Sequence, residues 1–214
     1  MRAAILRNIG DEKLDVVADA ETVETGPGLV KVGIRCTGVC HSDLSGMKGI
    51  VPQPVPAVLG HEGAGEVLEV GEGVTSVSVG DHVVVSWVPP CGTCQYCVGG
   101  QPNLCVTIMF TSAVSPRFTQ GGEQVGGFAG TGTFAEEVVL PAEAAIKIDD
   151  DVPFDIASLI GCGVMTGVGA AMAPGSQKWN GAWADFVNAP NRMSSSAACV
   201  AGPAGGDARI SEST

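Results

Sequence analysis

Hydrophobic and polar positions alternate in short runs along residues 30–87, and turn residues separate the runs. Residues 30–34 read Val-Lys-Val-Gly-Ile, a period of two that is typical of a half-buried strand. Residues 66–70, 82–85 and 134–140 are further β-rich runs, and glycines at 71, 73 and 80 mark turns. This spacing predicts an antiparallel sheet curled into a barrel or a sandwich.

A helical pattern follows Asp151-Val152-Pro153, where acidic residues and a proline suit a helix N-terminus. We expect this helix to break around the Gly-Cys-Gly of residues 161–163 and to resume briefly. Residues 156–177 carry no charge, which leaves a membrane span open as an alternative. Their five glycines and one proline favour a buried, glycine-rich segment instead.

The last part of the chain differs in composition from the rest. Residues 173–214 are rich in Ala, Gly, Ser and Pro and keep no sustained periodicity. We therefore expect one domain over residues 1–172 and a low-complexity, poorly ordered tail over 173–214. An altered reading frame would also explain so abrupt a change.

Composition and charge narrow the function. Glycine supplies 31 of 214 residues, about twice its usual share, which favours a turn-rich β architecture. The net charge of −12 argues against nucleic acid and against an anionic membrane surface as partners. The N-terminus lacks a long apolar stretch of the kind found in secretory signals, so we expect a cytoplasmic protein whose cysteines stay reduced.

Four cysteines are clustered in the spacing C-x2-C-x2-C-x7-C, at Cys91, Cys94, Cys97 and Cys105. Thiolates so close in sequence can surround one Zn²⁺ ion as a closed tetrahedron, which leaves no position for water and makes the site structural. An iron–sulfur cluster or two disulfides are the alternatives.

Three further segments join this loop to give a specific pattern. Residues 37–43 read Thr-Gly-Val-Cys-His-Ser-Asp, residues 60–65 read Gly-His-Glu-Gly-Ala-Gly, and residues 160–167 read Ile-Gly-Cys-Gly-Val-Met-Thr-Gly. In this order and spacing, residues 1–172 resemble the catalytic domain of the medium-chain zinc alcohol dehydrogenases. The resemblance implies a mainly β fold with short helices, a GroES-like β-barrel.

The resemblance also implies two zinc ions per chain. Cys40, His61 and Cys162 would hold a catalytic zinc and leave its fourth position open for water or an alcohol. Zinc at such a site lowers the pKa of a bound alcohol, which prepares it to release hydride. The four-cysteine loop would hold the structural zinc.

Roles for neighbouring residues follow from the same resemblance. Ser42 would take the hydroxyl proton, Asp43 would orient the ring of His61, and Glu62 would modulate exchange beside the zinc. Some relatives relay the proton through a histidine at the position of Ser45, so the relay here must be shorter or run through water.

Four more residues are assigned to the cofactor and to the substrate. His41 would face the pyrophosphate of NAD, and Thr166 would face its nicotinamide. Trp87 and Phe134 match positions that line the substrate pocket, with ordinary core aromatics as the alternative interpretation of both.

A dinucleotide-binding fingerprint is missing from these 214 residues. Residues 201–206 are glycine-rich but lack the G-x-G-x-x-G spacing after a strand. We therefore expect no Rossmann domain here, and little NAD binding or turnover by these residues alone. The sequence predicts an NAD-linked alcohol dehydrogenase acting on a small alcohol or aldehyde, with a homo-oligomer left open. The alternative is a zinc-stabilised β-domain without catalysis.

Overall fold

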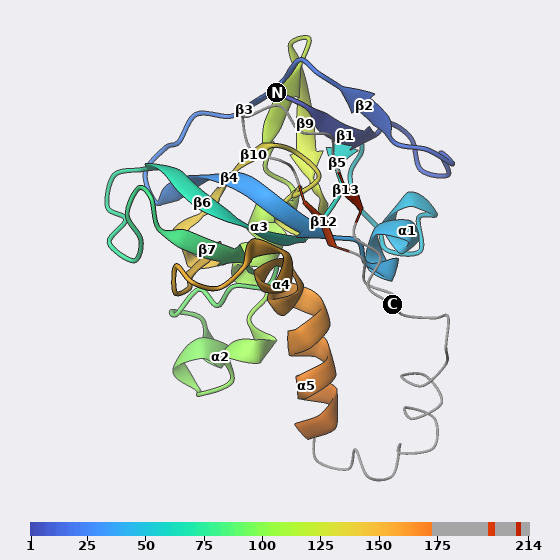
Figure 1. Ribbon diagram of the computed structural model, residues 1–214. Helices are drawn as coiled ribbons and strands as arrows, with labels where there is room; N and C mark the ends of the chain where they lie inside the picture. The colour runs from blue at the N-terminus through green and yellow to red at the C-terminus, as the bar shows by residue number, and fades with distance from the viewer. Residues whose placement is uncertain (173–196, 200–208, 211–214) are drawn as a thin grey trace.

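The computed structural model describes residues 1–172, 197–199 and 209–210, and Figure 1 shows how their elements are arranged. Two short strands come from the C-terminal part, β12 (Ala197–Cys199) and β13 (Arg209–Ile210). The other residues of the tail lie outside the described residues, so the expected disorder of residues 173–214 stays a prediction.

Two sheets form the body of the molecule. The six-stranded sheet has its strands in the order β2 (Asp15–Val17), β1 (Ala3–Leu6), β5 (Ala57–Val58), β9 (Glu123–Gly127), β8 (Phe118–Gln120) and β3 (Ala20–Thr22). The seven-stranded sheet runs β11 (Ala145–Lys147), β7 (His82–Val85), β6 (Glu62–Val70), β4 (Leu29–Gly38), β12 and β13, with β10 (Glu137–Pro141) also paired to β4. The expectation of a mainly β fold with short helices is confirmed.

The long strand β4 shows why the apolar alternation is informative. Its buried and half-buried residues alternate from Leu29 to Cys36, and Val30 and Val32 are completely buried. They join one core in which Phe118 is the largest fully buried side chain. Burying a valine or phenylalanine contributes about 1.5–3 kcal/mol each, so the sheets have a substantial core of their own.

Short helices connect the strands. These are α1 (His41–Met47), α2 (Gln95–Val98) and α3 (Thr107–Ala113), with 3₁₀ turns at Pro102–Leu104, Phe128–Gly130 and Ala142–Ala144. The expected helix after Pro153 begins as α4 (Phe154–Leu159). Its expected break at 161–163 was wrong, because the backbone continues through a π-helical turn, Ile160–Val164, into α5 (Met165–Met172).

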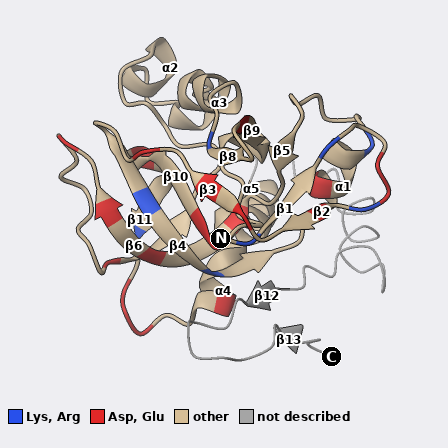
Figure 2. Cartoon of the chain, turned by 90° about the horizontal axis from the view of Figure 1, so that it is seen from above, with Lys and Arg blue, Asp and Glu red and all other residues tan. Residues whose placement is uncertain are grey.

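The continuous stretch Phe154–Met172 has the length and composition of a membrane-crossing helix, and 22% of its most apolar window is buried. Its first part packs on β4 and β6, whereas α5 extends away from the sheets (Figure 1). Length and composition alone are weak grounds for a membrane span, so the expectation of no membrane partner stays a prediction. In Figure 2, positions of acidic residues (red) lie on both sheets and on α4 and outnumber those of basic residues (blue), in keeping with the net charge.

Candidate metal centres and substrate pocket

The four-cysteine loop lies between β7 and β8 and brings four sulfur atoms together. Cys94 precedes α2, Cys97 lies within it, and Cys105 follows the turn Pro102–Leu104. The four sulfurs lie within 4.8 Å of one another. Measured separations are 3.6 Å from Cys94 to Cys97 and 4.0 Å from Cys91 to Cys97.

These separations suit one tetrahedral ion. With Zn–S bonds of about 2.3 Å, the edge of the sulfur tetrahedron is about 3.8 Å, between the two measured values. All four cysteines are free thiols, so the two-disulfide alternative is not what the structure has. Cys36, outside both clusters, is disulfide-bonded, so the expectation that the cysteines stay reduced was wrong for this residue.

Hydrogen bonds prepare the loop for thiolates. The backbone N–H groups of Cys94 and Cys91 donate to Cys91 Sγ and Cys105 Sγ, each at 3.3 Å. Bonds from Thr93, first from its backbone, and from Cys94 lower the pKa of Cys91 to about 5. Burial and the neighbouring cysteines raise the pKa of Cys97 to about 12. Cys91 and Cys97 therefore do not ionise together without a cation among them, which is the chemistry of a metal ligand set.

A second cluster gathers donors from three separate parts of the chain. Cys40 is the N-cap of α1, His61 comes directly before β6, and Cys162 lies in the π-helical turn. With the carboxylate of Glu62, their donor atoms lie within 4.8 Å of one another. His61 and Glu62 are almost completely buried, at 2% and 1% exposed. The structure thus brings together the three expected ligands and adds a fourth donor atom beside them.

Charge is unusually concentrated at this buried cluster. Neighbouring Cys162 and His61 lower the pKa of Cys40 to about 3 against the effect of burial. Cys40, burial and Glu62 in turn raise the pKa of Cys162 far above its usual range. Burial, and then the charge of Cys40, raise the pKa of Glu62, whose Oε2 is buried without a hydrogen-bond partner in the described part of the chain. A cation at the cluster would stabilise the negative charges of Cys40, Cys162 and Glu62 at the same time.

The carboxylate of Asp43 contacts two residues of this cluster, Cys40 and His61. Its Oδ2 accepts the backbone N–H of Cys40 at 3.0 Å, and its Oδ1 accepts that of Gly60 at 2.9 Å. Oδ1 also lies 3.4 Å from His61 Nδ1. Burial acts to lower the pKa of His61, but Asp43 and Cys40 outweigh it and raise the pKa to about 9. Asp43 therefore lies where it can orient the ring, as the resemblance implies.

Replacing Asp43 by asparagine is expected to weaken metal binding at this cluster by about 10- to 100-fold, because the ring loses its charged partner while the side-chain shape is kept. Competition between the protein and a chromophoric chelator measures this affinity. The control is Asp149→Asn, an exposed residue outside both clusters. Equal affinities for the two variants would remove Asp43 from the site.

Close backbone contacts explain two of the glycines around the cluster. A Cβ on Gly38 would collide with the carboxylate of Glu62, and a Cβ on Gly161 would collide with the carbonyl oxygen of Val85 in β7. Glycine is therefore needed where β4 and the π-helical turn approach their neighbours. The second contact places the turn that carries Cys162 next to the last residue of β7.

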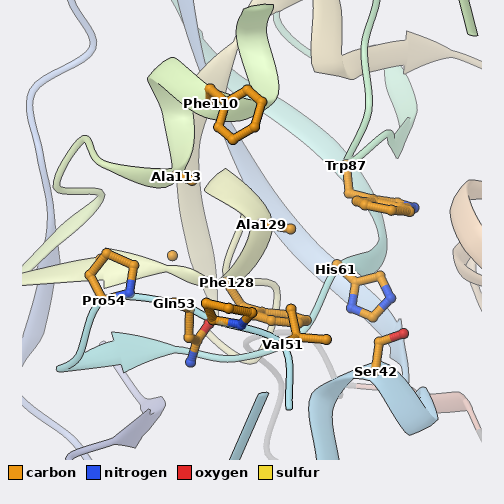
Figure 3. A pocket seen from close by; sticks show the side chains of 13 residues that line it. Ser42, Val51, Gln53, Pro54, His61, Trp87, Phe110, Ala113, Phe128 and Ala129 are labelled. Carbon is orange, nitrogen blue, oxygen red and sulfur yellow. The ribbon is translucent and has the colours of Figure 1, made fainter. Parts of the chain in front are cut away.

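A pocket of about 260 Å³ borders the second cluster, and Figure 3 shows it from close by. Ser42 and His61 form part of its wall, so the buried donors adjoin an open space. The remaining wall is largely apolar and comes from Val51, Pro52, Gln53, Pro54, Trp87, Phe110, Ala113, Gly126, Gly127, Phe128 and Ala129. The rings of Trp87 and Phe128 meet that of His61 edge-on, with centroids at 5.9 and 5.4 Å.

Of the two residues that the sequence assigned to the pocket, Trp87 and Phe134, only the first is among the described residues that line it. Phe134 packs against the core clusters instead, and its backbone N–H donates to the carbonyl of Leu59 at 2.9 Å. Phe110 and Phe128 also line the pocket, and no sequence signal predicted this. The prolines on both sides of Gln53 indicate a restrained backbone at another part of the pocket wall.

The two expected cofactor residues are both exposed. His41 lies in the first turn of α1, where its Nδ1 is 3.4 Å from Ser45 Oγ. Thr166 lies near the start of α5. The relay residue Ser42 is half-buried, and its Oγ lies 3.5 Å from Cys40 Sγ. Each side chain is accessible from outside the sheets, as contact with another molecule requires.

Comparison with known proteins agrees with this geometry. Residues 26–150 match the family model described as the alcohol dehydrogenase GroES-like domain. The chain is 42% identical over 163 residues to alcohol dehydrogenase class-3 of Dictyostelium discoideum, covering 73% of this chain and 43% of that protein. It is 45% identical over 156 residues to the putative alcohol dehydrogenase D of Mycobacterium tuberculosis, covering 71% and 42%.

Solved structures give the same answer. An alcohol dehydrogenase zinc-binding domain protein from Burkholderia ambifaria matches with a TM-score of 0.72 and 33% identity, over 79% of this chain and 47% of that one. Benzyl alcohol dehydrogenase from Acinetobacter calcoaceticus matches with a TM-score of 0.69 and 32% identity, over 80% and 47%.

The fold and the matches define the class: the chain belongs to the alcohol dehydrogenase GroES-like domain family. Its curated relatives are named as alcohol dehydrogenases or as S-(hydroxymethyl)glutathione dehydrogenases. The chain spans less than half the length of the curated relatives it matches.

Proposed function

We propose that this chain is the zinc- and substrate-binding part of an alcohol dehydrogenase that oxidises an alcohol to an aldehyde or ketone by hydride transfer to NAD. One observation carries the proposal: a cluster of two thiols and an imidazole borders an apolar pocket, whose wall includes the imidazole of His61 and the neighbouring Ser42. A purely structural metal site needs no pocket beside it. An alcohol that reacts at a metal needs the metal and also a pocket that holds its carbon chain.

Cys40, His61 and Cys162 would hold the catalytic zinc, and the loop from Cys91 to Cys105 would hold the structural zinc. When bound at the first site, zinc supplies Lewis-acid chemistry that lowers the pKa of an alcohol. Asp43 keeps the imidazole of His61 oriented toward the donor cluster. Glu62 offers a further oxygen at the same cluster, which suits a residue that modulates ligand exchange.

Ser42 is the residue best placed to receive the hydroxyl proton. It lines the pocket and lies 3.5 Å from Cys40 Sγ, so a hydroxyl group bound at the cluster comes within its reach. Ser45 contacts His41, which supports a short path from α1 to solvent. The apolar rings of Trp87 and Phe128 line the rest of the cavity and offer water few hydrogen-bond partners there.

The cofactor assignments extend the same proposal. His41 would contact the pyrophosphate of NAD and Thr166 its nicotinamide. Their exposure supports these roles, because a dinucleotide has to approach from outside the sheets. A cytoplasmic location belongs to the proposal as well. The free thiols of the six cysteines in the two clusters support it, whereas the disulfide at Cys36 is of a kind that is rare in a reducing compartment.

The second candidate is a zinc-stabilised β-domain without catalysis, favoured by the closed four-thiol loop and the core of the sheets. Both candidates predict zinc at the loop. They differ at Cys40, His61 and Cys162, because a catalytic site exchanges its fourth ligand for an alcohol.

Protein purified without chelator is expected to contain two zinc ions per chain by elemental analysis. After exchange of the catalytic zinc for Co²⁺, addition of benzyl alcohol is expected to change the visible spectrum of the cobalt. Cys40→Ser serves as the control and should lack both the second metal ion and the spectral change. One zinc per chain, or a spectrum indifferent to alcohol, would favour the non-catalytic domain. Iron with visible absorbance would contradict the structural-zinc assignment.

A further inference from the structure

The pocket offers polar side chains to a ligand at one end. Ser42, Gln53, His61 and Trp87 are the described residues with polar side chains that line it. The amide atoms of Gln53 and the indole nitrogen of Trp87 are buried, with almost no exposed surface, so a ligand in the pocket does not reach them. The polar groups that remain are the hydroxyl of Ser42, 3.5 Å from Cys40 Sγ, and the donor cluster to which His61 belongs. Both lie at the same end in Figure 3.

The described residues that line the pocket also carry no carboxylate, ammonium or guanidinium group. Arg117 is close in space but packs behind this wall, where its Nε donates to the carbonyl of Gly130 at 3.2 Å and its side chain is 4% exposed. A carboxylate that enters the pocket therefore leaves water without an ion-pair partner on the wall, which is strongly disfavoured. The net charge of −12 further repels an anion.

Aromatic rings surround the space that remains. Trp87 and Phe128 meet the ring of His61 edge-on, and Phe110 comes from α3. In Figure 3 the rings of Phe110, Trp87 and Phe128 stand on different sides of the pocket. Phe110 is 63% exposed although it lines the pocket, so part of its ring is free to contact a ligand. Aromatic side chains favour stacked and edge-to-face contacts with another ring.

We propose that the substrate of this site is an uncharged alcohol with one aromatic ring, whose reacting hydroxyl is its only polar group. The proposal rests on the function proposed above and narrows its substrate class. A cavity of about 150 Å³ holds benzene, so the volume of about 260 Å³ suits one ring with small substituents. Relatives named S-(hydroxymethyl)glutathione dehydrogenase differ in this respect, because glutathione is a peptide that carries carboxylates and an ammonium group.

The first test compares two alcohols that differ in one group at the far end. 4-Methylbenzyl alcohol and 4-hydroxybenzyl alcohol have nearly the same shape, but only the second has to bury another hydroxyl. Their dissociation constants are measured with the zinc-loaded chain by ligand-observed NMR. We expect the methyl compound to bind at least about fivefold more tightly, because the second hydroxyl loses water and gains no partner.

The second test asks whether charge excludes a glutathione conjugate. S-Methylglutathione has the charged groups of the glutathione adduct but no free thiol that could bind zinc. It is not expected to displace 4-methylbenzyl alcohol from the zinc-loaded chain, even at about a hundredfold excess, because its carboxylates find no partner on the pocket wall. The same NMR signal measures the displacement.

The third test examines the aromatic rings. Benzyl alcohol and cyclohexylmethanol have the same number of carbon atoms, and we expect the aromatic compound to bind about threefold more tightly. Phe110→Leu keeps an apolar side chain but removes a ring, so this ratio should fall. Val114→Ala, an exposed residue just after α3 that does not line the pocket, should keep the wild-type ratio. Both positions are exposed, so both variants should fold and keep their zinc.

The outcomes separate this proposal from the proposed function. Equal or tighter binding of 4-hydroxybenzyl alcohol, or displacement by S-methylglutathione, refutes the substrate class, and the dehydrogenase proposal stands as long as alcohols change the cobalt spectrum. An unchanged ratio in Phe110→Leu refutes the contribution of its ring. If no alcohol binds or changes the spectrum, both proposals are refuted.

Discussion

Replacing Cys105 with serine is expected to remove one zinc ion and to lower the free energy of unfolding by about 3 kcal/mol or more. Cys105 is the buried member of the four-cysteine cluster. The loop around it contains only the short helix α2 and one 3₁₀ turn and is mostly exposed from Gly92 to Leu104, so it has little core of its own. Its order therefore depends on the ion to a degree that the sheets do not share.

The matched variant is Cys40→Ser, which should also remove one zinc ion but lower the melting temperature much less. The sheets bury their own core, and Cys40 lies at a helix end outside it. Elemental analysis counts the metal, and thermal unfolding followed by circular dichroism compares stabilities. Limited proteolysis should cut residues 91–105 only in Cys105→Ser. If Cys40→Ser proves more damaging, the structural and catalytic assignments must be exchanged.

Adding one methyl group at Gly161 is expected to empty the second cluster while leaving the four-cysteine loop intact. The Cβ of Gly161→Ala would overlap the carbonyl oxygen of Val85, which is backbone and cannot rotate away. The π-helical turn must then withdraw from β7 and take Cys162 with it. Overpacking of this kind costs about 1–3 kcal/mol.

Gly167→Ala is the control in the same helical stretch. A Cβ on Gly167 meets no atom within 4 Å, and alanine favours the helix by up to about 1 kcal/mol over glycine. The two substitutions should thus shift the melting temperature in opposite directions, and only Gly161→Ala should lose zinc, one ion per chain. Retention of both ions by Gly161→Ala would show that Cys162 does not depend on this contact.

Sequence periodicity located the strands that bury one face and missed those that do not alternate. The run at residues 82–85 coincides with β7, and the run at 30–34 lies inside β4. The strands β2 and β3 contain three residues each, too few for a period, and they are ordered by partners elsewhere in the chain. The expected strand at 134–140 begins later, at Glu137, because Ala135 bridges to Ala3 instead of pairing with β4.

The clustering of the expected metal ligands could be predicted because the spacing of these residues in the chain is itself informative. Cys40, His61 and Cys162 stand within short segments whose resemblance to a known family is specific, and the structure brings them together. The pocket wall could not be predicted in the same way. Phe110 lies in α3, Phe128 in a 3₁₀ turn and Gln53 in the loop before β5, and only folding places them around one cavity.

The expected helix break shows how local rules can fail near such a site. Glycines at 161 and 163 weaken a regular α-helix, but here they permit a wider turn that keeps the helix continuous. Packing against β7 favours the continuous helix over the expected break, and the local sequence gives no sign of this packing.

The first turn of α1 combines tasks that most sites divide among distant segments. Cys40 Sγ accepts the N–H of Ser42, while the carboxylate of Asp43 accepts the N–H of Cys40, so a reciprocal cap starts the helix with the same atoms that serve the metal cluster. In the proposed function, these four consecutive residues would contribute a metal ligand, an exposed imidazole, a hydroxyl at the pocket and a carboxylate that orients His61.

This economy has a consequence for how the protein can change. Side chains within the tetrapeptide can be exchanged one at a time, but its length cannot vary. A single inserted or deleted residue would rotate every later side chain by about 100° around the helix axis, and all the tasks would fail together. Diversification of this site is therefore confined to substitution here, and variation in length is left to the loops that form the pocket wall.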